Sequence, residues 1–140
     1  MASERLAGMI LTGPDDRPLP LGYRWAIANG LTSFTPWYVL DSPKQVAGIS
    51  REFSVETGIE CQAFARRQDM DDAAAFVVRD GTVVDEVISA HLSWKGSADP
   101  YVRVERFPDF WAWLKGRALP DMADWPSESD IQEALGGRAV

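Results

Sequence analysis

Hydrophobic and polar positions divide the chain into short elements that Pro, Gly and Asp separate. Segments 35–41, 61–66, 73–79 and 82–92 are rich in aromatic and β-branched residues or alternate with period two, which favours strands. Asp80-Gly81 lies between the last two and predicts a two-residue hairpin. Short runs at 9–12 and 101–104 are interpreted as two further strands. Because short connections join neighbouring strands, we expect an antiparallel sheet.

The strand at 61–66 has an alternating pattern. With strict period two, Gln62, Phe64 and Arg66 would lie on one face of the sheet. The other face would carry Cys61, Ala63 and Ala65.

Four segments have helical signals. The clearest is Ser42-Pro43-Lys44-Gln45, with a Ser N-cap, Pro at the first position and Gln at the third, followed by an apolar stripe that ends at Gly58. We predict another helix at 20–28, which ends at Asn29-Gly30. A third starts near Phe107 and ends at Gly116, and a short last helix covers 127–136.

The third helix is expected to close the sheet through one buried face, formed by Phe107, Phe110, Trp111 and Leu114. The resulting fold class is α+β, an antiparallel meander sheet of four to six strands with helices packed around it. A length of 140 residues suits one domain. Its core is expected over residues 19–115, and residues 117–140 form a tail with a short helix.

Composition and charge restrict the functional class. Apolar residues make up 46% of the chain, as in globular proteins, and no stretch has the length of a signal peptide h-region or a membrane span. We therefore expect a cytoplasmic protein. With 21 acidic and 14 basic residues, the net charge of −7 disfavours nucleic acid and anionic membranes as partners and favours a basic protein.

Metal and catalytic chemistry have few candidate residues. One Cys and one His cannot supply a structural zinc site, so no metal or cofactor is expected. Cys61 and His91 could act as nucleophile and base if their strands brought them together, but nothing in the sequence requires this contact, and a buried Cys and a strand-end His are the favoured interpretation. No phosphate-binding loop, nucleophile elbow or zinc-protease motif occurs.

Acidic and aromatic residues are the candidate binding groups. Asp69, Asp71 and Asp72 form an acidic cluster that lacks the spacing of a calcium loop, and is either a solvated loop or, with Asp85 and Glu86, a docking surface. Among the six Trp residues, Trp94 lies in a polar loop and is expected to be exposed. Trp25 and Trp111 are expected inside, whereas the pattern does not decide Trp113 and Trp125.

The order of these elements resembles the SUKH superfamily, which includes fungal cell-wall-assembly regulators and bacterial immunity proteins. The matching pieces are Leu19-Pro20-x-x-Tyr23 with Asn29-Gly30, the strand and capped helix through Phe53, and Phe64-Ala65 at the start of the central sheet. The acidic loop and hairpin to His91 and Phe107-x-x-Phe110-x-x-x-Leu114 complete the match. Two departures are a short segment upstream of Leu19 and an Arg, Arg106, in place of the usual Ser before the last aromatic pair.

This resemblance implies binding to a protein partner and no catalysis. Bacterial members of the family mostly neutralise secreted toxins, often nucleases, by direct contact, so we expect an immunity protein that binds a basic toxin domain. A cytosolic regulatory adaptor that docks on a cellular protein is the main alternative, because the sequence signals are the same. A small enzyme that uses Cys61 or His91 is a third hypothesis.

Overall fold

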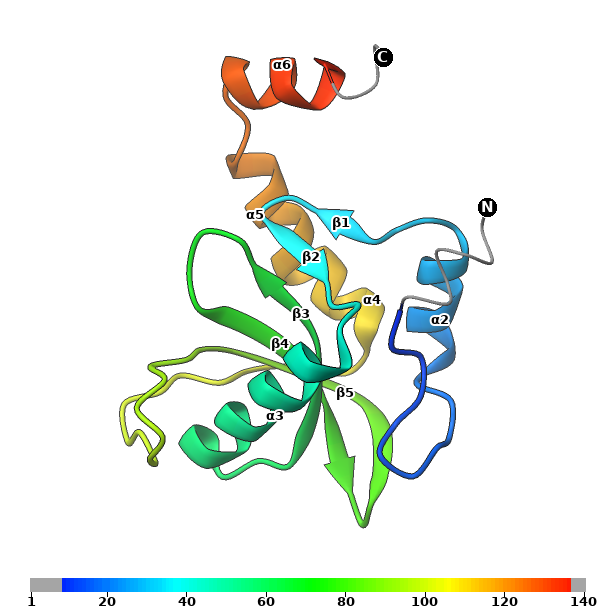
Figure 1. The fold of residues 1–140 in the computed structure, drawn as a ribbon, viewed down its shortest axis with the longest axis vertical. Helices are drawn as coiled ribbons and strands as arrows, with labels where there is room; N and C mark the ends of the chain where they lie inside the picture. The colour runs from blue at the N-terminus through cyan, green and yellow to red at the C-terminus, as the bar shows by residue number, and fades with distance from the viewer. Residues whose placement is uncertain (1–8, 137–140) are drawn as a thin grey trace.

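A six-stranded antiparallel sheet forms the centre of the molecule, in the computed structural model that describes residues 9–136 (Figure 1). Its strands follow one another in the order β1 to β6, a simple meander. Their bounds are β1 Ser33–Phe34, β2 Trp37–Val39, β3 Cys61–Arg67, β4 Asp72–Arg79, β5 Thr82–His91 and β6 Glu105–Phe107. The predicted α+β class and meander sheet are therefore confirmed.

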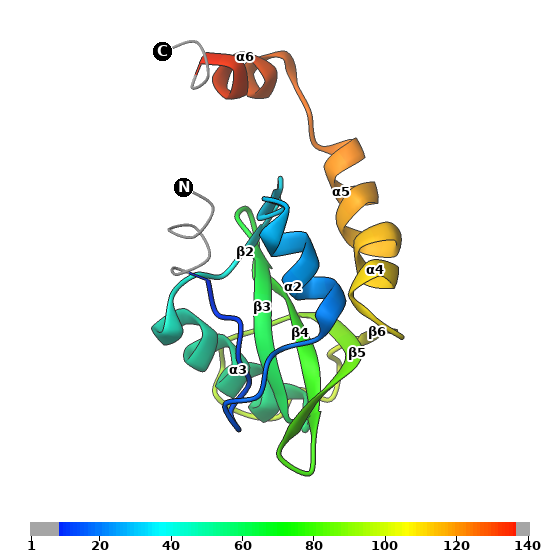
Figure 2. The same cartoon turned by 90° about the vertical axis from the view of Figure 1, so that its right-hand side faces the viewer.

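Helices cover both faces of this sheet (Figure 2). On one face, α3 (Pro43–Thr57) packs Val46, Ile49 and Phe53 onto Ala and Val residues of β3, β4 and β5. On the other face lie α2 (Leu21–Ala28) and a continuous helical segment formed by α4 (Phe110–Trp113), a π-helical turn (Leu114–Ala118) and α5 (Leu119–Asp124). The last helix, α6 (Glu128–Gly136), stands apart from the sheet.

Local sequence signals explain the best-predicted elements. The hydroxyl of Ser42 accepts the backbone N–H of Gln45 at 3.4 Å at the start of α3, and Gly58 ends that helix with φ of 74°. At the hairpin, Asp80 and Gly81 have φ of 53° and 77°, as a type I′ turn requires.

The aromatic core lies between the sheet and the second helical layer. Tyr23 of α2 packs edge-on against Phe64, Phe76 and Phe110, with ring centroids 5.5 to 5.7 Å apart. Phe64 and Phe76 stack at 4.5 Å. Such contacts add to the free energy gained from burying the rings themselves.

A β-bulge at Phe64 changes the predicted faces of β3. Ala63 pairs with Ala75 but Ala65 pairs with Ala74, so Phe64 is an extra residue in this strand. Phe64 and Ala65 consequently face the same aromatic core. The strict alternation expected for Ala65 and Arg66 was wrong, because the bulge reverses the faces beyond it and turns Arg67 towards α5.

The predicted buried face at 107–114 was partly wrong. Asp109 caps α4 by accepting the N–H of Ala112 at 2.8 Å, so the helix begins later than expected and its phase differs. Phe110 and Leu114 are buried as predicted, but Trp113 is fully buried in place of Trp111. Phe107 belongs to β6.

Gly116 does not end the helix as predicted. The π-helical turn carries the chain through it, and a Cβ atom there would lie only 3.2 Å from the Phe107 ring. The glycine thus permits a close approach of the helix to β6, and the helical segment extends to Asp124.

Two Trp residues predicted inside are exposed. Trp25 is 63% and Trp111 is 42% exposed. Trp111 lies over α2 at Gly22, where a Cβ atom would meet its indole nitrogen at 2.6 Å. The Trp111 side chain therefore borders the α2–α4 contact without entering the core, and Trp25 is an exposed residue of α2.

The minor strands also differ from expectation. Of the segment 35–41 only β2 is a strand, because the turn at Thr35-Pro36 separates it from β1, which lies upstream of the predicted segment. The segment 101–104 forms no strand, because pairing with β5 begins at Glu105. Segment 9–12 contributes a single bridge, between Thr12 and Pro18. None of the helices within residues 9–136 is long and apolar enough to cross a membrane.

Candidate protein-binding surface

The loop between β3 and β4 carries two of the three predicted aspartates at the surface. Asp69 binds the guanidinium of Arg67 through both carboxylate oxygens, at 2.8 and 3.0 Å. That contact lowers the pKa of Asp69. The side chain of Asp71 is 50% exposed and lies 3.9 Å from Arg66, so it is the most accessible acidic group of this loop.

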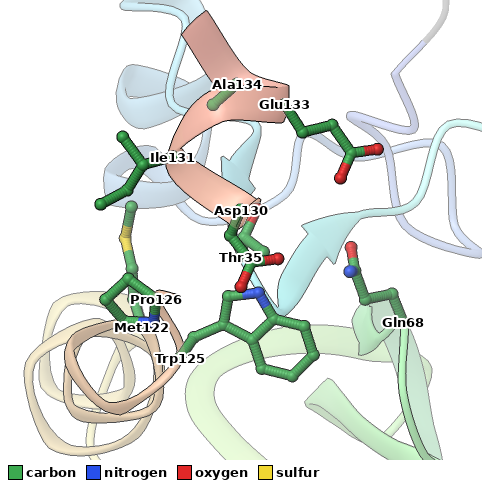
Figure 3. Close-up of a pocket in the computed structure, with 9 residues that line it drawn as sticks. All are labelled: Thr35, Gln68, Met122, Trp125, Pro126, Asp130, Ile131, Glu133 and Ala134. Carbon is green, nitrogen blue, oxygen red and sulfur yellow. The ribbon is translucent and has the colours of Figure 1, made fainter. Parts of the chain in front are cut away.

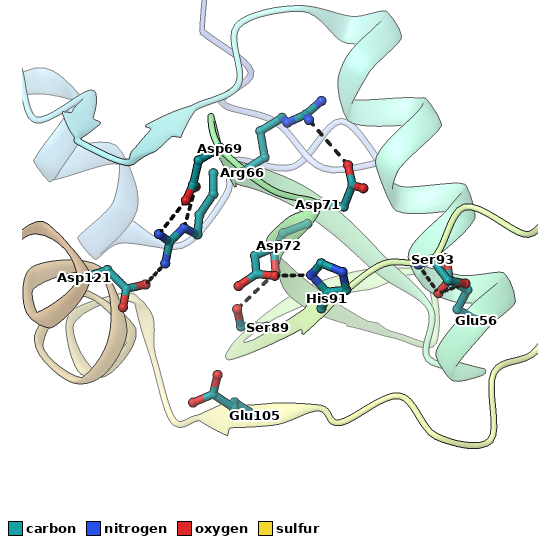
Figure 4. A network of polar contacts seen from close by, with 12 residues as sticks. Glu56, Arg66, Asp69, Asp71, Asp72, Ser89, His91, Ser93, Glu105 and Asp121 are labelled. Carbon is teal, nitrogen blue, oxygen red and sulfur yellow. Dashed lines mark hydrogen bonds and ion pairs between the residues drawn. The ribbon is translucent and has the colours of Figure 1, made fainter. Parts of the chain in front are cut away.

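Asp72 was predicted to be part of the same exposed cluster, and this placement was wrong. It is the first residue of β4, is only 6% exposed, and points towards the helical segment that contains Arg117. One carboxylate oxygen binds Arg117. The other lies 2.6 Å from Nδ1 of His91 (Figure 4). Asp72 therefore holds the fold together and presents no free charge.

Arg117 is the centre of this polar network. Besides Asp72 it binds Glu105 of β6 and, at 2.8 Å, Asp121 one turn further along the helix. Its guanidinium also lies 5.4 Å from the centre of the Trp37 ring. One side chain thus connects β2, β4, β6 and α5.

Asp121 receives three donors. The indole N–H of Trp37 donates at 2.8 Å, and Arg67 and Arg117 bind the same carboxylate oxygen. Burial alone would raise the pKa of Asp121, but these hydrogen bonds and charges lower it. The acid is therefore held ionised between two arginines.

Asp85 and Glu86 do not join the acidic loop. Glu86 lies beside Val87, which pairs with Phe76, whereas the loop ends at Asp72, about 13 Å away along β4. Glu86 is bound by Arg106 at 2.8 Å and by Arg79, and the contact with Arg106 lowers its pKa. The predicted docking surface that unites both groups is therefore not assembled.

Trp94 is exposed as predicted, by 46%. Its backbone has a φ of 59°, a left-handed conformation that a bulky residue rarely adopts and that surrounding contacts must hold. Trp94 lies next to the acidic loop, because it lines a small hollow together with Arg66, Asp71 and Asp72.

Glu56 holds this backbone from inside α3, and sequence reasoning missed it. The carboxylate is 2% exposed and accepts the N–H of Trp94 at 3.0 Å and the N–H and hydroxyl of Ser93 at 2.7 and 2.9 Å. Burial alone would raise the pKa of Glu56, but these hydrogen bonds lower it. A signal was present in the sequence, because Glu56 continues the apolar stripe of Val46, Ile49 and Phe53 at helical spacing.

Comparison with known proteins does not identify a family for this chain. Protein-family models, curated proteins and solved structures contain no match to this chain. The resemblance to the SUKH superfamily therefore stays a prediction.

The proposed Cys61 and His91 pair does not form. Cys61 pairs with Val77 and His91 with Asp72, so their strands hold them about 16 Å apart along β4. Burial raises the pKa of the Cys61 thiol to about 12, which keeps it protonated. Within residues 9–136, no three His, Cys, Asp or Glu side chains converge in a way that could hold a metal ion.

Proposed function

We propose that this chain is a cytoplasmic, non-catalytic protein-binding module, an immunity protein that neutralises a basic toxin domain by direct contact. The observation that carries the proposal is the presentation of Trp94. A large aromatic side chain stands at the surface, and a buried carboxylate fixes the strained backbone that carries it. Trp is enriched among residues that dominate binding energy, and prior ordering reduces the entropy that binding must remove.

Charge supports a basic partner. The chain has a net charge of −7, and the accessible carboxylate of Asp71 lies beside Trp94. A toxin that holds nucleic acid needs a positive cleft, and an acidic surface with an aromatic anchor suits such a cleft. The resemblance to the SUKH superfamily supports the toxin as the kind of partner.

A protection assay tests this function. The product of a gene adjacent to that of this chain is expressed in bacterial cells with and without the chain, and growth is measured. We expect growth only when the chain is present, and we expect Trp94→Ala to lose protection. Tyr101→Ala is the matched control, because Tyr101 is 90% exposed yet has no buried carboxylate that fixes its backbone.

Two results would contradict the proposal. Protection by Trp94→Ala as strong as that by the natural chain would remove Trp94 from the interface. A non-toxic neighbour, together with a stoichiometric complex between the chain and a cellular protein, would favour the regulatory adaptor.

A further inference from the structure

A cleft of about 420 Å³ lies between α6 and the end of the sheet (Figure 3). Its walls are formed on one side by the C-terminal helices and on the other by the β1–β2 turn and the residue after β3. The lining residues that matter here are Met122, Trp125, Ile131, Ala134, Thr35 and Gln68. Pockets of roughly 300–1,000 Å³ accommodate small ligands, so this cleft has room for a large side chain and its neighbours.

The helix that covers this cleft buries no residue of its own. Ile131 and Leu135 of α6 are 45% and 54% exposed. A helix of nine residues is marginal in water, because most helical stability in proteins comes from packing of an apolar face. The apolar face of α6 therefore lacks the packing that would stabilise it.

Charge identifies the occupant that suits the cleft. Residues 118–136 contain five acidic residues and no basic residue, in a chain whose net charge is −7. Asp121 is bound by Arg67 and Arg117, which leaves Asp124, Glu128, Asp130 and Glu133 unbound by any basic side chain of residues 9–136. Asp130 and Glu133 line the cleft itself. Because a second copy of the chain would bring the same acidic helix against this one, a second copy is disfavoured.

We propose that the α5–α6 cleft binds a basic segment of a protein partner, with one large apolar side chain of that segment inserted against Trp125 and Ile131. Lys or Arg residues on either side of this anchor face Asp130 and Glu133. The acidic residues Asp124 and Glu128 lie outside the cleft lining, so the charge extends further than one side chain and fits a segment of several residues.

The β3–β4 loop connects the cleft with the surface around Trp94. Gln68 lines the cleft and directly precedes Asp69 of the acidic loop, and the hollow at Trp94 includes Asp71 of that loop. One partner can therefore contact both. This inference rests on the proposed function for the kind of partner, a basic protein, and adds a second contact to it.

Peptide titration of the isotope-labelled chain tests the cleft. The probe is a synthetic peptide of alternating Lys and Leu residues with one central Trp. Its binding is measured by the NMR chemical shifts of the Trp125 indole and the Gln68 amide. We expect saturable shifts with this peptide. We expect none with a Lys-to-Glu peptide or with a peptide whose Leu and Trp are replaced by Ser, because both charge and anchor are required.

Matched variants locate the binding. Ile131→Ser removes an apolar lining residue, whereas Leu135→Ser removes an exposed apolar residue of the same helix outside the lining. We expect the dissociation constant for the peptide to rise about fivefold or more with Ile131→Ser and less than twofold with Leu135→Ser. Ala134→Leu fills the cleft and keeps helix propensity, so it should also weaken binding. Weaker binding by this variant could not be explained by unfolding of α6.

The outcomes separate the two proposals. Equal affinities for the three variants and the natural chain, or shifts confined to other surfaces, would overturn the cleft proposal and leave protection by the chain unaffected. A dimer in analytical ultracentrifugation that Ile131→Ser dissociates would overturn it by making a second copy the occupant. If the chain binds the peptide but does not protect cells in the growth assay, the toxin partner is rejected and the cleft proposal stands.

Discussion

Glu56 accepts the backbone N–H of Trp94 at 3.0 Å, so a carboxylate inside α3 fixes an aromatic residue at the surface. The contact joins residues 38 positions apart in the chain. It explains how a loop without regular structure can hold a bulky residue at positive φ.

Replacing this carboxylate by an amide should destabilise the fold. In Glu56→Gln the amide oxygen can still accept from Ser93. The amide NH₂ group would then face the N–H of Trp94, and two donors cannot form a hydrogen bond with each other. We expect a loss of about 1.5 to 3 kcal/mol in the free energy of unfolding by urea, as for hydrogen bonds to charged groups. Glu52→Gln is the control, because Glu52 contacts Glu56 and accepts the exposed N–H of Gly96 at 3.1 Å but holds neither Ser93 nor Trp94, and a loss as large there would contradict the role of Glu56.

Acid should weaken the fold through the same group. Because the folded pKa of Glu56 lies below the ordinary value of 4.5, its contribution is present above that pH and is lost as pH falls through the folded pKa. Contact with Glu56 raises the pKa of Glu52, which partly offsets this slope. Urea midpoints measured between about pH 6 and pH 3 should fall less steeply in Glu56→Gln than in the natural chain, and parallel slopes would reject this assignment.

The helical phase at 110–114 can be tested by a pair of aromatic truncations. Phe110 is 1% exposed and contacts Tyr23, Phe64 and Trp113, so Phe110→Ala should cost about 3 to 5 kcal/mol. Trp111 is 42% exposed, so Trp111→Ala should cost about 1 kcal/mol. Thermal or urea unfolding measures both, and equal losses would show that Trp111 is in the core after all.

Arg117 should be the most sensitive position of the polar network. Arg117→Met removes the guanidinium but leaves Asp72, at 6% exposure, with His91 as its remaining partner. We expect a loss of about 3 kcal/mol, because removing one partner of a buried ion pair is costly. In a double-mutant cycle, adding Asp72→Asn should recover part of that loss. Strictly additive losses would mean that the two side chains are not coupled.

Local sequence signals predicted the parts of the fold that local interactions decide. The cap at Ser42, the stop at Gly58 and the hairpin at Asp80-Gly81 depend on residues within a few positions, and all three are confirmed. The bulge at Phe64 was missed, because it depends on how β3 fits β4 and the aromatic core. Trp111 and Trp113 were confused because the predicted stripe was counted from Phe107, which belongs to β6, whereas the helix itself buries Phe110, Trp113 and Leu114.

The candidate surface was predicted less well, for a related reason. Asp72 looks like a third loop aspartate in the sequence, but its partner Arg117 is 45 positions away and only the folded chain brings them together. Glu56 was missed because the distant loop at Trp94 gives it its role. Exposure of Trp94 itself was predicted correctly from its polar surroundings.

Charge reversal can separate the steering role of the acidic loop from its structural role. Asp71→Lys changes an exposed carboxylate beside Trp94, so it should slow association with a verified basic partner without a large loss of stability. The salt dependence of the association rate should also decrease, because ions screen exposed charges most strongly. Asp72→Lys should instead unfold the chain, since it places a cation against Arg117 in a buried site. Stopped-flow association and urea unfolding measure the two effects, and an unchanged on-rate for Asp71→Lys would remove this loop from the encounter.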